Sequence, residues 1–410
     1  MDNQILFGEW LPDQPEYNNP GVPYVSNVLP SVNGFKPMRE ITPITDAINA
    51  RARGGIAAKD KSGVVYGYVG NETKLYSIGA TAHTDVTNTG GAYALSSGEN
   101  WEFARWGEKI LAVCIDEPPQ SITLAGANFA DIAGSPPKAR HIGVIGDFVV
   151  LGNIDDGTAK PGTVIWSGIN DETDWTSSSV TQSDSQELRS NARNGGGEIM
   201  KISGGSEFGV IFQEYTIQRM VYEGLPRVFR FDEVLPQVGT PCKNSVVQEG
   251  NLIHFYGQDG FYQLSNGTEL RKIGDQRVDK FFQADCDFNN PDRVIGAEDP
   301  RSSNVIWIYP STSNGMPDKY IVYNWTSDKW ASGTISVEWV YSSISSGYTL
   351  EGLDNINSSI DALGISLDSP DLKGGQLQFA VYDSNNKFGI FSGAIKNGEV
   401  ETTYFKLNPS

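Results

Sequence analysis

Cysteine is scarce in this chain of 410 residues, and long apolar runs are missing. We expect the three cysteines to be reduced and mostly buried, because they lie far apart and form no CxxC pair: Cys114, Cys242 and Cys286. No run reaches the roughly 18 apolar residues of a membrane-spanning helix. The first residues, Met1–Gln4, lack the basic region and the apolar core of a signal peptide. We therefore expect synthesis and folding in a cytosol, without a membrane span.

Histidine is equally scarce, with only His83, His141 and His254. None lies in an HExxH motif or close to a cysteine in the sequence, which argues against a zinc site. The chain has no G-x-S-x-G elbow and no phosphate-binding G-x-x-x-x-G-K-[ST] loop. The glycine run Gly195–Gly197 lacks the strand-to-helix setting of a phosphate cradle and is more typical of a flexible loop. We predict no catalytic residues, no metal and no cofactor.

Positive charge is in deficit, since 31 Lys and Arg face 50 Asp and Glu, giving a net charge of −19. Such a surface disfavours sequence-specific DNA binding, although it suits a surface that DNA must pass without sticking. Two acidic segments are candidate cation loops by residue type. Asn153–Gly157 lacks the alternating ligands of a calcium loop, so an acidic turn is the favoured interpretation. The same holds for the second group, Asp285, Asp287 and Asp292.

Short apolar hairpins recur along nearly the whole chain. Each has an apolar run, a break at Gly, Asp, Asn or Pro, and a second apolar or alternating run. The seven stretches are Ser62–Ser77, Glu108–Leu124, Ile142–Ser167, Glu207–Tyr222, Gly250–Leu264, Ser303–Trp325 and Gln376–Ser392. Their centres are separated by roughly 40 to 70 positions, the spacing of propeller blades with loop insertions. A single hairpin cannot bury its own apolar face, so several must stack around one axis.

We therefore predict an all-β protein with a β-propeller body of six blades, with seven blades also allowed by the hairpin count. Residues 1–50 carry seven prolines and form an extended Pro-rich arm that packs on its own body or on a neighbour. Residues 51–331 form the propeller body. Residues 332–410 form a loop-rich insertion and extension with a last β-hairpin, which either completes the propeller or contacts a neighbour. The arm is a candidate source of the closing strand.

Helical periodicity is nearly absent from the chain. Thr45–Arg53 is a candidate short helix with Thr45 as its cap. The other two candidates are Val278–Gln283 and Ile356–Leu363.

Several longer strings depart from generic propeller sequence. They are F-A-R-W-G-E-K-I-L-A-V (Phe103–Val113), the run from Phe129 to Gly152, V-I-W-S-G-I-N-D-E-T-D-W-T (Val164–Thr176), V-I-F-Q-E-Y-T-I-Q-R-M (Val210–Met220), F-R-F-D-E-V-L-P-Q-V-G-T (Phe229–Thr240), Y-G-Q-D-G-F-Y (Tyr256–Tyr262) and I-S-L-D-S-P-D-L-K-G-G (Ile365–Gly375). Their order resembles the tail nozzle, or DNA-stabilisation, family of short-tailed bacteriophages. The resemblance runs from about residue 50 to the end and is strongest from 100 to 262. None of the strings is a catalytic motif.

The resemblance implies a non-enzymatic structural protein of the virion tail, made in the host cytoplasm. It implies a propeller that assembles as a ring of six beneath the portal and adaptor proteins, next to tail fibre or spike proteins. The ring would continue the DNA exit channel, retain the packaged genome and open on infection. A net charge of −19 fits such a conduit, because a like-charged lumen offers DNA no adhesive sites.

The alternative is a glycan-binding or glycan-cleaving tail protein. Propeller glycosidases place two carboxylates across a central pocket, and 50 acidic residues leave that open. Ser97–Trp101 and Ser327–Trp330 match only part of a sialidase Asp-box motif. We expect the associated tryptophans to cap blade hairpins: Trp101, Trp175, Trp325 and Trp330. Under the ring hypothesis, deletion of residues 1–45 should weaken assembly and leave the monomer folded.

Overall fold

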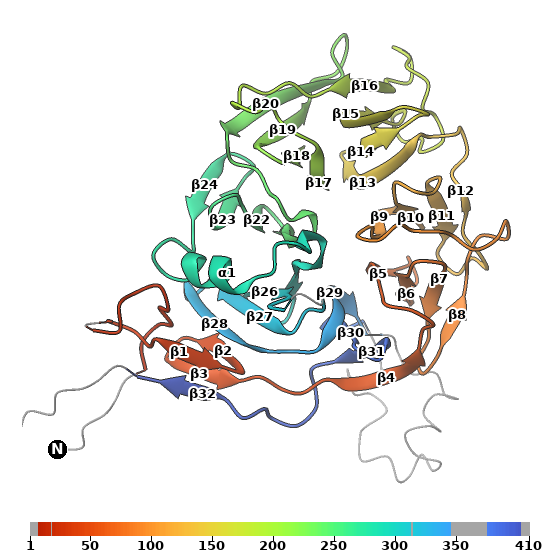
Figure 1. Cartoon of the computed structure of the whole chain (residues 1–410). Coiled ribbons are helices and arrows are strands. Elements are labelled where there is room, and N and C mark those ends of the chain that lie inside the picture. The colour runs from red at the N-terminus through yellow and green to blue at the C-terminus, as the bar shows by residue number, and fades with distance from the viewer. Residues whose placement is uncertain (1–6, 18, 313–314, 346–374, 403–410) are drawn as a thin grey trace, which may run out of the picture.

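A computed structural model describes residues 7–17, 19–312, 315–345 and 375–402. Within these ranges the chain forms seven four-stranded antiparallel sheets arranged as blades around one axis (Figure 1). The prediction of an all-β propeller is confirmed, and the blade count is the higher of the two that the sequence allows. Each predicted hairpin coincides with the second and third strands of one blade.

In blades 1 to 6 the strands follow one another along the chain from the axis to the rim, whereas the rim strand of blade 7 comes from the N-terminal segment. Blade 1 comprises β5 (Gly55–Lys59), β6 (Val65–Gly70), β7 (Leu75–Ile78) and β8 (His83–Asp85). Blade 2 comprises β9 (Glu102–Trp106), β10 (Lys109–Val113), β11 (Gln120–Thr123) and β12 (Ala130–Asp131). Blade 3 comprises β13 (Lys138–Ile145), β14 (Phe148–Asp155), β15 (Ala159–Trp166) and β16 (Asp184–Glu187). Blade 4 comprises β17 (Ile199–Ser203), β18 (Phe208–Gln213), β19 (Thr216–Tyr222) and β20 (Phe229–Pro236). Blade 5 comprises β21 (Val247–Glu249), β22 (Leu252–Tyr256), β23 (Phe261–Ser265) and β24 (Glu269–Lys272). Blade 6 comprises β25 (Ile295–Asp299), β26 (Asn304–Tyr309), β27 (Lys319–Asn324) and β28 (Lys329–Thr334). Blade 7 comprises β29 (Val337–Ile344), β30 (Leu377–Asp383), β31 (Lys387–Ile390) and β4 (Thr42–Ala47).

The second strand of a blade is apolar on both faces because a neighbouring blade covers each face. All six residues of β26 are buried, and so are the first seven of β14. The third strand β27 has four consecutive buried residues, whereas the rim strand β16 has none. The buried apolar side chains accordingly form separate clusters, most of which lie between adjacent blades. The core is therefore spread around the ring, and the axis holds other residues.

The propeller is closed by a strand from the N-terminal segment. Strand β4 pairs antiparallel with β31 and becomes the rim strand of blade 7 (Figure 1). Inside β4, the buried Thr45 hydroxyl accepts a hydrogen bond of 3.2 Å from the Phe388 amide. The predicted helix at Thr45–Arg53 is wrong. Thr45–Ala47 is the end of strand β4, which pairs with the free edge of β31, and residues 48–53 form neither helix nor strand.

The other short elements are η1 (Lys243–Ser245), α1 (Asp279–Asp285) and η2 (Pro291–Arg293). The helix α1 confirms the candidate at Val278–Gln283, while the candidate at Ile356–Leu363 lies outside the described residues. In the stretch that the sequence pattern assigns to a loop-rich extension, Val337–Ile344 is strand β29 at the axis of blade 7. This strand was missed because its Ser and Glu residues interrupt the apolar pattern.

The N-terminal arm packs on its own body. Strands β1 (Tyr24–Ser26), β2 (Val28–Ser31) and β3 (Gly34–Pro37) lie outside blade 6, and β1 pairs with β32 (Glu399–Glu401) near the other end of the chain (Figure 1). Trp10 and Val25 are buried in the cluster that joins the arm to blades 5 and 6. The Ser332 hydroxyl of β28 donates a hydrogen bond of 3.1 Å to the Val25 carbonyl. Deletion of residues 1–45 is therefore expected to destabilise the monomer itself, contrary to the expectation from sequence.

Candidate functional site at the propeller axis

The axis is lined by the first strands of the blades, which lie next to one another around the centre (Figure 1). A cavity of about 240 Å³ opens there, with walls from β5, β9, β17, β21, β25 and β29. Its lining combines aromatic rings, such as Trp339 and Tyr341, with the ionisable side chains of Glu102, Lys201 and Glu298. The axial cavity is therefore the place where charged groups from different blades meet.

Glu102, the first residue of β9, is the most connected of these groups. Its carboxylate accepts hydrogen bonds of 2.9 Å from Lys201 Nζ, 2.9 Å from His141 Nδ1 and 3.3 Å from the Ile142 amide. Burial would raise the pKa of Glu102, but Lys201 and His141 outweigh it and lower the pKa to about 2. Burial lowers the pKa of His141, an effect that the neighbouring Glu102 carboxylate opposes.

A second set of ion pairs joins four consecutive blades beside Glu102. Arg140 on β13 donates to both Glu99 oxygens, at 3.2 and 3.0 Å, and to Glu198 Oε2 at 2.7 Å. Lys243, in η1 before blade 5, donates to Glu99 at 3.2 Å. Glu99 precedes blade 2 and Glu198 precedes blade 4, so these contacts run through blades 2, 3, 4 and 5. The arrangement ties the blades to one another at the axis and leaves these charges balanced.

Two other carboxyl groups on the first strands have raised pKa values, unlike Glu102. Burial raises the pKa of Glu298 on β25 to about 7, with added repulsion from Glu249 and Asp299. Burial also raises the pKa of Glu249 on β21, whose Oε2 is buried without a hydrogen-bond partner in the described part of the chain. Glu298 can therefore hold a proton near neutral pH, while Glu102 in the same cavity remains ionised.

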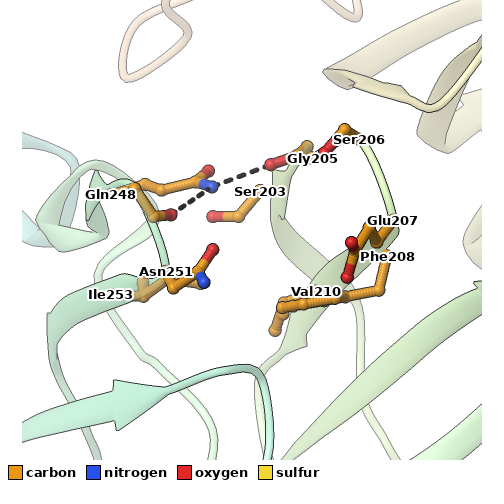
Figure 2. Close-up of a pocket in the computed structure, with 11 residues that line it drawn as sticks. Ser203, Gly205, Ser206, Glu207, Phe208, Val210, Gln248, Asn251 and Ile253 are labelled. Carbon is orange, nitrogen blue, oxygen red and sulfur yellow. Dashed lines mark hydrogen bonds between the residues drawn. The ribbon is translucent and has the colours of Figure 1, made fainter.

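A separate pocket of about 240 Å³ lies between blades 4 and 5 (Figure 2). Ser203, at the end of β17, and the following turn form one part of its wall, and Gln248 and Asn251 of blade 5 face them. Phe208 and Ile253 supply apolar surface. This interblade pocket is lined by side chains that can donate and accept hydrogen bonds, together with apolar surface.

The three histidines are dispersed over different blades. His83 on β8 makes a 2.8 Å hydrogen bond with the Tyr382 hydroxyl of blade 7. His141 lies at the axis, and His254 on β22 is fully buried beside Tyr323 and Trp325. Burial lowers the pKa of His254 to about 4. The structure therefore does not bring the histidines together.

The acidic segments singled out in the sequence form local turns, ion pairs and hydrogen bonds. Asp155 caps the Gly157 amide at 2.9 Å, and Asp156 forms a surface ion pair with Lys160. Asp285 binds Lys319 on β27 at 2.6 Å. The remaining two residues of the second group are Asp287, which caps Asn289 at 3.1 Å, and Asp292, whose carbonyl accepts from Asn244 at 2.7 Å. In the described ranges, no three His, Cys, Asp or Glu side chains are grouped so as to hold a metal ion.

The cysteines and tryptophans also have clear positions. All three cysteines are buried and free, as the sequence predicts. Trp175 donates its ring N–H to the Glu172 carbonyl within its own loop at 2.9 Å. Two other tryptophans join neighbouring blades. Trp101 donates to the carbonyl of Asn71, in the β6–β7 hairpin turn of blade 1, at 2.9 Å, and Trp330 donates to the Ile273 carbonyl at 3.1 Å.

The axial ion pairs are the feature that sequence reasoning missed. A recurring signal was present, since a charged residue stands in or just before the first strand of blades 2 to 5. These residues are Glu102, Arg140, Lys201 and Lys243. Without the blade boundaries, such isolated charges cannot be told from ordinary surface residues. No helix among the described residues is long and apolar enough to cross a membrane.

Comparison with known proteins assigns no family to the chain. No family model and no curated protein matches the chain. Among solved structures, the extracellular domain of a one-component system from B. thetaiotaomicron is similar, with a TM-score of 0.48 and 11% identity over 86% of this chain and 39% of that chain. The WD40 domain of Neurospora crassa Pan2 has a TM-score of 0.45 and 7% identity over 88% of this chain and 98% of that chain. At this level of similarity, neither comparison bears on function.

Proposed function

We propose that the chain is a structural component of a bacteriophage tail, a nozzle protein that assembles as a ring of six beneath the portal and adaptor. In this role the ring forms the DNA exit channel, retains the genome until ejection, and performs no chemistry. The sequence strings between Phe103 and Tyr262 support this proposal, and so does a propeller body that serves as a frame for assembly.

The narrowness of the axis is the observation that supports the ring. The axial cavity measures about 240 Å³, and the ion-paired side chains of Glu102 and Lys201 line it. The major groove of duplex DNA alone is about 12 Å wide, so a duplex does not fit along the axis of one propeller. A DNA channel built from this protein must therefore lie between several copies, as in a closed ring.

Exposed apolar side chains supply a candidate surface for contacts between copies. Val180, beside blade 3, is 86% exposed and Leu225, in the β19–β20 turn of blade 4, is 55% exposed. The two loops are joined by a 2.8 Å hydrogen bond from the Tyr222 hydroxyl to Gln182. Exposed apolar groups on two neighbouring segments of this kind favour burial in a protein contact.

Introduction of charge at this surface tests the assembly proposal. We expect Val180→Asp combined with Leu225→Asp to abolish the ring, measured by light scattering, while circular dichroism remains that of the folded monomer. Val64→Asp is the matched control, because Val64 is 50% exposed in blade 1, away from these loops. A wild-type protein that stays monomeric with and without portal and adaptor proteins would refute the ring.

One observation favours a second function, cleavage of surface glycans. Glu102 and Glu298 line the same axial cavity, and their environments push the two pKa values apart, to about 2 and about 7. Glycosidases use one ionised and one protonated carboxyl group in this way. If the chain has this activity, it releases reducing sugars from host surface glycans and Glu298→Gln abolishes the release. No release by the wild-type protein eliminates this function.

A further inference from the structure

We propose that the interblade pocket between blades 4 and 5 binds one neutral, hydroxyl-rich ring, the chemical class of a monosaccharide. The pocket is independent of the proposed ring assembly and is distinct from the axial cavity, although Gln248 lines both. Its volume of about 240 Å³ equals that of about eight water molecules in the liquid, which suits a single small ring.

The pocket presents hydrogen-bonding groups that no neighbour uses. In the described part of the chain, no side-chain hydrogen bond is formed by Ser203, Ser206, Glu207 or Asn251. Only 5% of Ser203 is exposed, and its hydroxyl points between Gln248 and Asn251 (Figure 2). A hydroxyl that no protein group engages is free to donate to and accept from a ligand in the pocket.

The wall of the pocket is held in place before any ligand arrives. The Gln248 amide nitrogen donates to the Gly204 carbonyl at 2.8 Å and to the Gly250 carbonyl at 3.2 Å, which bridges the two blades. The Gly205 amide donates to the Val144 carbonyl of blade 3 at 3.0 Å, and the Gly205 carbonyl accepts from Gly146 at 2.8 Å. Because the turn after Ser203 is fixed on both sides, little entropy is lost in ordering it on binding.

A single charged side chain lines the pocket. The Glu207 carboxylate, on the side opposite Asn251, opposes anions (Figure 2). The Arg219 guanidinium does not line the pocket, but it lies 4.4 Å from the centre of the Phe208 ring, next to Glu207 in the chain, where its positive charge reduces the attraction of Glu207 for cations. Serine and asparagine both donate and accept, as sugar hydroxyls do, and the carboxylate can accept from two adjacent hydroxyls. Phe208 and Ile253 can contact the apolar face of a sugar ring.

Saturation-transfer NMR on the full chain tests the assignment with glucose, galactose and N-acetylglucosamine as probes. Choline and inorganic phosphate serve as cationic and anionic probes. We expect at least one sugar to bind saturably, and Glu207→Gln and Asn251→Ala each to weaken it by about tenfold, the effect of losing a hydrogen bond to a charged or polar partner. Both side chains are exposed, so these variants are expected to fold.

Glu269→Gln is the matched control, because Glu269 is an exposed glutamate on β24 of blade 5 that does not line the pocket. Unchanged sugar affinity in this variant, with weakened affinity in the two pocket variants, supports the site. Three results would overturn it: no saturable binding of any sugar, equal binding by wild type and the pocket variants, or tighter binding of choline or phosphate than of the sugars.

Discussion

Glutamine in place of Glu102 removes the central negative charge of the axial ion pairs with little change of shape. Lys201 then keeps a positive charge whose partner is gone, although the oxygen of the new side-chain amide can still accept the hydrogen bond from His141. Breaking a buried ion pair by removing one partner costs about 3–5 kcal/mol. The shift of the Glu102 pKa from 4.5 to about 2 gives a similar value, about 3 kcal/mol at about 1.36 kcal/mol per unit. We expect Glu102→Gln to lose about 3 kcal/mol of unfolding free energy at pH 7.

The pH dependence of this loss follows from the direction of the shift. A lowered carboxyl pKa contributes stability above the unfolded value of 4.5, and that contribution is lost as pH falls towards about 2. Urea unfolding of wild type and Glu102→Gln should therefore differ most at pH 7 and converge at low pH. Asp156→Asn is the control, because the Asp156–Lys160 pair is on the surface. Equal stability of Glu102→Gln and wild type at pH 7 would refute the account of the axis.

The same denaturation assay tests three further residues. Trp10→Ala should lower the unfolding free energy by about 3–5 kcal/mol, because Trp10 is 1% exposed. Tyr17→Ala, in the same arm, should have little effect, because Tyr17 is 86% exposed. Similar losses in the two variants would contradict the packing of the arm. Burial raises the pKa of Asp279 from 3.8 to about 7, so stability falls as pH rises from about 4 to about 7. Asp279→Asn should therefore be more stable than wild type at pH 8 and equal to it below about pH 4. Burial lowers the pKa of His254 from 6.5 to about 4, so stability present above pH 6.5 should fall by about 3 kcal/mol as pH drops to 4, and His254→Phe should remove that slope.

The repeat architecture was readable from sequence because blade hairpins are local. Each apolar run and its turn lie within a short stretch, as in Gly250–Leu264, so the pattern survives without knowledge of the fold. Closure of the ring is not local. Thr45 and Phe388 meet across 343 positions, and the cap-like threonine misled the local prediction of a helix. The choice between six and seven blades depended on that closure, which only the three-dimensional pairing resolves.

The axial site was out of reach for the same reason. Lys243 and Glu99 are 144 positions apart, and their contact exists only because adjacent blades bring their first strands together. The interblade pocket likewise joins Ser203 with Asn251 from separate blades. Charges and hydroxyls in a sequence carry no sign of their partners, so their pairing had to come from the fold.

The central claim is that several copies of this propeller enclose a channel that one copy cannot provide. Negative-stain electron microscopy of the purified full chain, with light scattering for mass, tests it most directly, alone and after addition of portal and adaptor proteins. The account predicts rings of six around an open centre, with a mass about six times 44.7 kDa. A monomer that ignores those partners would contradict it.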